Sequence, residues 1–399
     1  MGRMRWKVTL AVATAAVTVL TGCSGGGAEP TEAARAGDLT GQGEGALNLL
    51  TLAGDVENGS SAPRVDWVTP FEERTGCRVS WRVARSTQDM TAMMSNPDRR
   101  YDGVAAPPEV SGRLIAGRHA APVRTSAVEG YKRLDPKLRT VLRQEDETYG
   151  VPYLWDASLL LYDVNAVPQP NGWEALFEPG QARRHAGRVV VRDTPLSIAE
   201  VALYLKRAQP GLRIDDPYSL TPKQLAAVRK VLERQRPSVQ TYWAAQAEAV
   251  AAFAGGEARL GAGTPYQADV LSRAGRGVRA AVPAEGVTGR LTSWMVGARA
   301  VNPNCMYKWL GWTASAEVQR QAAVWNGTAP ANPAACSDDR ATAALCAAYR
   351  VGDRTALDGV TFARTPAKLC PAGKNRGERT CTDYVEWSRI WIETTKLDR

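Results

Sequence analysis

The chain has 399 residues and a formal net charge of +9 at pH 7, with only 2 histidines. A single hydrophobic core stops growing near about 250–300 residues, so this length favours two folded lobes over one. Basic and acidic residues alternate along most segments without long cationic runs, which argues against a nucleic-acid partner and indicates a solvated surface.

The first 23 residues predict export and lipid anchoring. Three basic residues precede an apolar run at 8–20, which is too short to span a bilayer. The run ends at Leu20-Thr21-Gly22-Cys23, which resembles the lipobox of bacterial lipoproteins, where the cysteine carries the lipid. We therefore expect residues 1–22 to be a signal peptide, Cys23 to be lipidated, and the rest to lie on the outer face of the cell membrane.

The six remaining cysteines predict disulfides, because an even number in an exported chain is typical of cross-links and not of metal ligands. Sequence alone allows about 15 pairings. Short loops favour Cys336 with Cys346 and Cys370 with Cys381, which leaves Cys77 for Cys305. No Cys-x-x-Cys occurs, so we expect no metal site.

Strand and helix signals alternate through the first part of the chain. Residues 23–46 are mostly small and polar, which predicts a flexible tether. The expected elements that follow are strands at 47–52, 78–83 and 102–106, a helix at 65–73 that ends at Gly76, and a helix after Ser86. This alternation predicts a parallel sheet with crossover helices.

The apolar run at 151–162 is the centre of the chain. Its near-continuous apolarity predicts a strand buried on both faces, which we expect to carry the chain from one lobe into the other. Tyr153, Trp155 and Asp156 would then lie where the lobes meet, a usual place for small ligands. The alternative is an ordinary core strand with two packing aromatic residues.

A second unit of the same kind follows. We expect strands at 188–192 and 260–264, a strand at 278–283 that leads back to the first lobe, and helices at 224–232, 245–254, 306–314 and 317–325. Ser197 and Glu200 have the spacing of a helix capping box. Tyr266 and Gln267 follow a Gly-rich strand end, which makes them ligand candidates.

Motifs of common enzymes are absent from the expected strands and helices. Gly-x-Ser-x-Gly occurs only as Gly22-Cys23-Ser24-Gly25-Gly26, at the lipobox-like sequence and not between a strand and a helix. The sequence has no His-Glu-x-x-His and no phosphate-binding Gly-x-x-x-x-Gly-Lys-Ser/Thr. Two histidines also leave little material for a catalytic triad. We therefore expect no enzyme and no cofactor.

Several motifs, in order, resemble the spermidine/putrescine-type solute-binding lipoproteins of ABC importers, in particular their actinobacterial branch. They are Trp67-Val68-Thr69-Pro70-Phe71-Glu72, Tyr101-Asp102-Gly103-Val104, Gly150-Val151-Pro152-Tyr153-Leu154-Trp155, Asn171-Gly172-Trp173-Glu174, Pro283-Ala284-Glu285-Gly286, Asn304-Cys305-Met306-Tyr307 and Ala329-Pro330-Ala331-Asn332-Pro333. The resemblance runs from about Leu47 to the C-terminus.

The resemblance implies an α/β fold of two lobes, the type II-like periplasmic-binding-protein fold, in which each lobe is a mainly parallel sheet flanked by helices. We expect residues 47–158 and 293–325 to form lobe 1, residues 159–292 to form lobe 2, and the disulfide-rich residues 326–399 to pack on both. The implied protein is a monomer that closes on a small-molecule solute and presents it to ABC permease subunits.

The ligand-binding positions depart from the family pattern. Polyamine-binding members look like aromatic boxes with acidic ends, which suits a flexible dication. The positions that differ here, or that we expect to line the site, are Leu52 and Asp55 in the first-strand turn, Thr194 and Ser197 at the start of the second-lobe helix, Thr264 where a tryptophan is expected, Arg290-Leu291-Thr292 in place of Trp-x-Asp, and Thr328.

A site with fewer carboxylates and an added Arg290, beside Arg192 and a helix N-terminus, should prefer a neutral or anionic solute. Asp55 and Asp156 leave two alternatives open: each could supply a new carboxylate to the solute, or one could pair with Arg290. We favour pairing, because an arginine at a lobe junction needs a partner. Ser197 has a second interpretation as a simple helix cap, and Trp294 and Trp309 as core residues.

The leading hypothesis is thus a membrane-anchored solute receptor of an ABC importer. A second hypothesis is a degenerate surface lipoprotein that senses or scaffolds without delivering a solute, since the aromatic box is lost. A surface hydrolase would need a triad or metal site that the sequence lacks.

Overall fold

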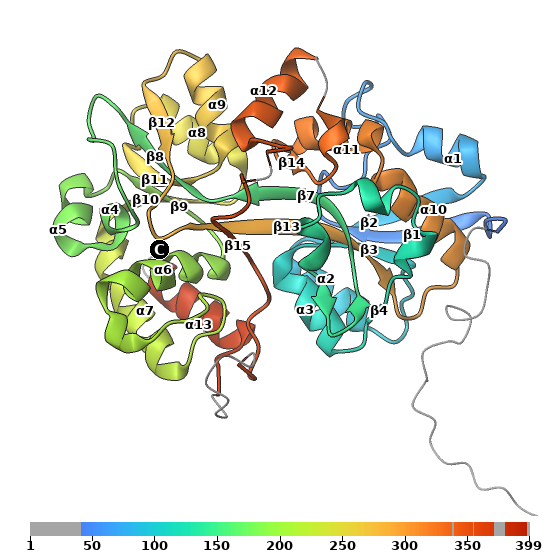
Figure 1. Cartoon of the computed structure of the whole chain (residues 1–399), viewed down its shortest axis with the longest axis horizontal. Coiled ribbons are helices and arrows are strands. Elements are labelled where there is room, and N and C mark those ends of the chain that lie inside the picture. Colours follow the sequence, from blue (N-terminus) through green and yellow to red (C-terminus); the bar gives the residue numbers. More distant parts are fainter. Residues whose placement is uncertain (1–40, 337–338, 354, 371–379, 397–399) are drawn as a thin grey trace, which may run out of the picture.

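The computed structural model describes residues 41–336, 339–353, 355–370 and 380–396. Two sheets lie side by side and helices cover their faces, so the chain forms two lobes (Figure 1). The larger sheet, in lobe 1, has the strand order β14-β7-β13-β3-β1-β2, with β4 and β15 also paired to β13. The sheet of lobe 2 has the order β10-β9-β11-β8-β12.

The strands have the following bounds. In lobe 1 they are β1 (Ala46–Thr51), β2 (Arg78–Val83), β3 (Gly103–Ala106), β4 (Ala120–Ala121), β7 (Val151–Ala157), β13 (Val287–Gly297), β14 (Ala329–Pro330) and β15 (Val360–Phe362), beside a small hairpin of β5 (Arg143–Gln144) and β6 (Glu147–Thr148). In lobe 2 they are β8 (Leu159–Asp163), β9 (Val189–Arg192), β10 (Val239–Trp243), β11 (Leu260–Gly263) and β12 (Val278–Ala281).

Helices flank both sheets. Those on lobe 1 are α1 (Thr69–Thr75), α2 (Thr87–Ser95), α3 (Pro108–Ala116), α10 (Pro303–Thr313) and α11 (Ala316–Asn326). Those on lobe 2 are α4 (Glu174–Phe177), α5 (Pro179–Ala182), α6 (Ile198–Ala208), α7 (Pro222–Gln235), α8 (Gln246–Ala254), α9 (Pro265–Arg273) and α13 (Tyr384–Thr395), while α12 (Arg340–Tyr349) contacts α11 and α9. Within the described ranges, none of these helices is long and apolar enough to cross a membrane.

Local signals explain the first unit. Gly76 adopts the left-handed conformation with φ of 70° and ends α1, and the Ser86 hydroxyl accepts the Asp89 N–H at the start of α2. The strands β1, β2 and β3 pair in parallel, as their alternation with helices predicts. In lobe 2, β9 pairs in parallel with β10 and β11.

The chain passes between the sheets through strands that lie side by side. The run at 151–162 is divided into β7, which is buried along its whole length, and β8, with Ser158 between them. The return strand is β13, which pairs antiparallel with β7. The expectation that residues 278–283 lead back was wrong, because β12 stays in the lobe 2 sheet beside β8.

The last part of the chain returns to lobe 2. β15 pairs with the start of β13, and the Thr365 hydroxyl, just beyond it, donates to the Pro108 carbonyl of α3. The helix α13 then packs against α7, with Trp387 and Trp391 in the hydrophobic core of lobe 2 (Figure 1).

Three disulfides join Cys336 to Cys346 and Cys370 to Cys381, the two pairs that short loops favour, and Cys77 to Cys305, the pair that was expected to remain. The end of the expected tether is not a free linker. The Glu44 carboxylate accepts the Asn304 and Cys305 N–H groups at the start of α10. A Cβ on Gly43 would lie 2.5 Å from the Cys77 sulfur, so only glycine allows the chain to pass this closely.

Candidate functional site

A set of charged and polar side chains lies where the two sheets meet, and we call it the inter-lobe polar cluster. It consists of Glu109 (α3), Asp156 (β7), Thr288 and Arg290 (β13), Arg192 (β9), Thr194 (just after β9) and Glu200 (α6). β9 and its parallel neighbours end at this junction, and carboxyl ends of parallel strands are where ligands bind in α/β proteins.

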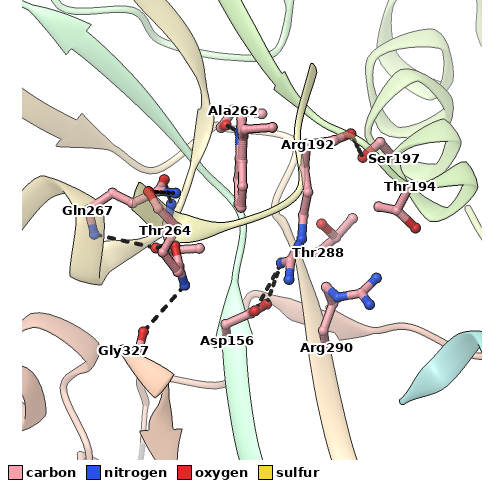
Figure 2. A network of polar contacts seen from close by, with 12 residues as sticks. Asp156, Arg192, Thr194, Ser197, Ala262, Thr264, Gln267, Thr288, Arg290 and Gly327 are labelled. Carbon is pink, nitrogen blue, oxygen red and sulfur yellow. Dashed lines mark hydrogen bonds and ion pairs between the residues drawn. The ribbon is translucent and has the colours of Figure 1, made fainter. Parts of the chain in front are cut away.

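Asp156 and Arg192 join the two lobes. The Arg192 Nη1 donates to both Asp156 oxygens at 3.0 and 2.9 Å, and the two side chains point toward one another (Figure 2). The Asp156 side chain is only 6% exposed, and the Arg192 guanidinium also lies over the Trp243 ring at 5.1 Å. This pair neutralises the carboxylate on the strand that crosses between the lobes.

Arg290 pairs with a residue that the sequence analysis missed. Its Nη2 donates to both oxygens of Glu109, at 2.6 and 2.8 Å, and the Thr194 hydroxyl donates to Glu109 Oε1 at 2.9 Å. Burial alone would raise the pKa of Glu109, but Arg290 more than offsets this and holds it below its usual value. The Glu109–Thr194 hydrogen bond is a second link between the lobes.

The expected pairing of Arg290 with Asp55 or Asp156 is therefore wrong. Asp156 lies opposite Arg290 in the β7–β13 register, yet its carboxylate binds Arg192. Burial lowers the pKa of Arg290, whereas Glu109 and Asp156 raise it, and the net effect is a rise. Glu109 follows two prolines that open α3 directly after a buried strand, and this position at a strand end was the signal that could have revealed it.

Glu200 has a different partner from the one that its sequence spacing predicts. Its expected partner was the backbone of a capping box, but its Oε1 accepts the Thr288 hydroxyl at 3.1 Å. Glu200 is 3% exposed, and this burial raises the pKa of its carboxyl to about 7, although Ser158, Thr288 and two arginines lower it. The position therefore exchanges a proton near neutral pH.

The predicted capping box at Ser197 does not form. The Ser197 hydroxyl donates to the Arg192 carbonyl at 3.1 Å, and Thr194 caps the short turn before α6 by accepting the Leu196 N–H. A 3-10 turn over Pro195–Ser197 precedes α6. Ser197 therefore lies inside this turn and not at its start, where a capping residue would lie. Ser197 thus supports the backbone next to the inter-lobe polar cluster and does not line it.

The Gly-rich strand β11 ends at Gly263, as expected, and Thr264 and Gln267 then form the capping box of α9. The Thr264 hydroxyl donates to Gln246 Oε1, and Gln246 Nε2 in turn reaches the Gly327 carbonyl of lobe 1 at 3.4 Å (Figure 2). Tyr266 packs close to Gly327. These residues form a separate contact between the lobes.

The remaining predicted residues lie in lobe 1, where three of them form hydrogen bonds with its own backbone. Asp55 Oδ2 accepts the Leu52 N–H at 3.0 Å, and the Tyr153 hydroxyl donates to the Asp55 carbonyl. Trp155 Nε1 donates to the Pro330 carbonyl. Thr292 is half-buried opposite Leu154. Burial raises the pKa of Asp55 to about 7, so it is a poor permanent anion.

Two of the three carboxyl groups at the junction are paired with arginines, so they do not form an acidic box. In the part of the chain that the structure describes, no group of three or more His, Cys, Asp or Glu side chains could hold a metal ion. The predicted lipid-bearing Cys23 lies outside the described residues. Two carboxylates are matched by two arginines, and two polar atoms, Arg290 Nη1 and Glu200 Oε2, are buried without a hydrogen-bond partner among the described residues.

Comparisons with known proteins agree with this architecture. Residues 66–345 match the model of the bacterial extracellular solute-binding proteins. The spermidine/putrescine-binding periplasmic protein of Escherichia coli is 23% identical over 302 residues, which are 73% of this chain and 83% of that protein.

Solved structures share the fold. The spermidine/putrescine ABC-transporter substrate-binding protein of Streptococcus pneumoniae superposes with a TM-score of 0.63 at 15% identity, over 88% of this chain and 98% of that one. A lipoprotein of Treponema pallidum superposes with a TM-score of 0.65 at 13% identity, over 88% and 99%.

Proposed function

Because the chain belongs to the bacterial extracellular solute-binding proteins, a family of carriers and not of enzymes, we propose that it is the membrane-anchored receptor of an ABC importer and prefers a neutral or anionic solute to a polyamine. The likeness to the polyamine-binding protein of Escherichia coli supports the transporter role. The preference rests on one observation, the pairing of the carboxylates at the lobe junction with arginines.

A polyamine should bind weakly at this junction. Asp156 and Glu109 are each within 3.0 Å of a guanidinium, so a second cation would have to displace an arginine from a buried carboxylate. A displaced arginine would then lose its partner in a region of low dielectric constant, which is costly. A solute that carries an acceptor group would instead add to the hydrogen bonds of Arg290.

A thermal-shift screen of the purified full-length protein tests this function. A solute at about a hundredfold its dissociation constant should stabilise the fold by about 2.7 kcal/mol. We expect compounds with a carboxylate or a neutral polar group to raise the melting temperature and putrescine and spermidine to leave it unchanged. A shift caused by the polyamines alone would contradict the proposed preference.

The second candidate function is a surface scaffold that binds no solute. It is favoured by the contacts that the lobes already make with each other, Asp156 with Arg192 and Glu109 with Thr194. The same screen separates the two functions. A protein that no compound class stabilises, but that keeps these contacts, would be the scaffold.

The lipid anchor is a separate part of the proposal. The signal-like N-terminus and the position of Cys23 support it. The Cys23→Ala variant should appear in the culture medium, whereas the wild-type protein should remain in the membrane fraction. Membrane retention of the variant after removal of peripheral proteins would contradict lipidation at this residue.

A further inference from the structure

Building on the proposed function, we propose that the solute is a small zwitterion, whose carboxylate binds Arg290 and whose ammonium group binds Glu200. The inference rests on the two buried polar atoms at the lobe junction that have no partner in the described part of the chain, Arg290 Nη1 and Glu200 Oε2. One is a charged donor and the other an acceptor, so together they select a ligand with both kinds of group.

One nitrogen of the Arg290 guanidinium is available to a solute. Its Nη2 is held by both oxygens of Glu109, at 2.6 and 2.8 Å, which fixes the plane of the group. Its Nη1 is buried and without a partner among the described residues. A buried donor without an acceptor is costly, and a carboxylate is the best acceptor for a guanidinium N–H.

Glu200 offers one carboxyl oxygen. Its Oε1 is occupied by the Thr288 hydroxyl at 3.1 Å, while Oε2 is buried with no donor at hydrogen-bond distance among the described residues, although the Ser158 side chain is near enough to lower the pKa of this carboxyl. The side chain comes from the first turn of α6 in lobe 2, whereas Arg290 lies on β13. An ammonium group placed here would satisfy the acceptor and stabilise the ionised carboxylate.

The side chains of Glu200 and Arg290 meet at one face of β13. Thr288 and Arg290 are two residues apart on β13, so their side chains point to the same face. Glu200 binds the first of them and Glu109 the second, which brings helices of both lobes to this face. Arg290 also lowers the pKa of Glu200, as a nearby cation should. A solute that bridges them would tie lobe 2 to β13.

Diamines and dicarboxylates satisfy only one of the two atoms with an opposite charge. A diamine would pair with Glu200 but place its second cation beside Arg290 or Arg192. A dicarboxylate would pair with Arg290 but place its second anion beside Glu200. A neutral sugar could satisfy both by hydrogen bonds, but it would gain no charge–charge attraction from either group.

The test measures binding to purified full-length protein by calorimetry and thermal shift. The probes are α-, β- and γ-amino acids, their N-acetylated and amidated derivatives, putrescine, succinate and glucose. We expect at least one free amino acid to bind, and both of its derivatives to bind about tenfold more weakly or worse, because each leaves one buried group unpaired.

Two variants locate the contacts. Glu200→Gln should weaken the amino acid about tenfold or more while leaving the N-acetylated derivative unchanged, and Arg290→Lys should weaken the amino acid and leave its amide unchanged. Glu233→Gln and Arg229→Lys, a surface pair on α7, are the matched controls and should change neither affinity. Unliganded melting temperatures report whether the variants fold.

The results distinguish a failure of the zwitterion proposal from a failure of the receptor function. Binding of succinate, glucose or putrescine without any amino acid would overturn the zwitterion and leave the receptor function in place. Equal affinity of wild type and Glu200→Gln for the amino acid would also overturn it. If no compound binds, the receptor function fails, and the zwitterion fails with it.

Discussion

Glu200 is the residue at the lobe junction whose ionisation should make the stability of the fold depend on pH near neutrality. Between its ordinary pKa of 4.5 and its value of about 7 in the folded protein, the folded state keeps a proton that the unfolded state releases. The free energy of unfolding therefore falls as the pH rises through this window, by up to roughly 3 kcal/mol, and the loss is complete above the higher value.

The variant Glu200→Gln should lack this part of the pH dependence. We expect its melting temperature to exceed that of the wild type at pH 8 and to approach it at pH 5, because the amide cannot ionise. Arg192, Arg290 and the Thr288 hydroxyl still face the position in both proteins. Melting curves from pH 5 to pH 8 measure the difference, and parallel profiles would show that Glu200 ionises normally.

Single residues also show where sequence patterns stop being informative. Ser197 and Glu200 have the spacing of a capping box, but the buried Ser197 N–H already donates to the Thr194 carbonyl, and the Glu200 carboxyl accepts the Thr288 hydroxyl instead. Arg290 was expected to pair with a carboxylate, and it does. Its partner Glu109 lies 181 residues away, a separation over which no local pattern acts.

At the scale of the elements, the N-terminus of α10 is capped by Glu44, a residue far from it in the sequence. Its own N-cap residue, Asn302, gives no side-chain cap, and the Glu44 carboxylate takes the N–H groups of Asn304 and Cys305 at 2.8 and 2.9 Å. A carboxylate at a helix N-terminus is favoured by the free N–H groups and by the helix dipole.

The Glu44→Ala variant should lose about 1 kcal/mol of unfolding free energy, since the carboxylate is exposed and screened by solvent. Urea denaturation measures this, with Glu73→Ala, an exposed change in α1, as the control. Equal midpoints for the two variants would mean that the contact contributes nothing to stability.

Elements with one dominant signal were predictable. The continuous apolar run of β7 gave the fully buried strand, Gly76 gave the end of α1, and the Ser86 cap gave the start of α2. The long strand β13 was missed, although its polar residues at 288, 290 and 292 occupy every second position, as in a half-buried strand.

At the scale of the whole molecule, one disulfide closes most of the chain. Cys77 and Cys305 are separated by 228 residues, whereas Cys336 and Cys346 are separated by 10. The long loop contains every strand of lobe 2 but not α13, and its closure restricts the unfolded state more than that of the short loop does.

Replacing Cys77 and Cys305 by alanine should therefore cost about 5 kcal/mol of unfolding free energy, and replacing Cys336 and Cys346 about 3 kcal/mol. Guanidinium denaturation of the two double variants compares them under the same conditions. A larger loss for the short loop would show that native packing, and not the entropy of the unfolded chain, governs the effect.

The position of α13 has a consequence for shortened copies of the chain. Trp387 and Trp391, close to the end of the chain, fill the core that lobe 2 builds around residues such as Leu176 and Val189. A copy of the chain without residues 384–395 would lack these two side chains and leave the face of α7 that packs against α13 uncovered. Limited proteolysis should therefore cut such a copy more readily than the whole chain.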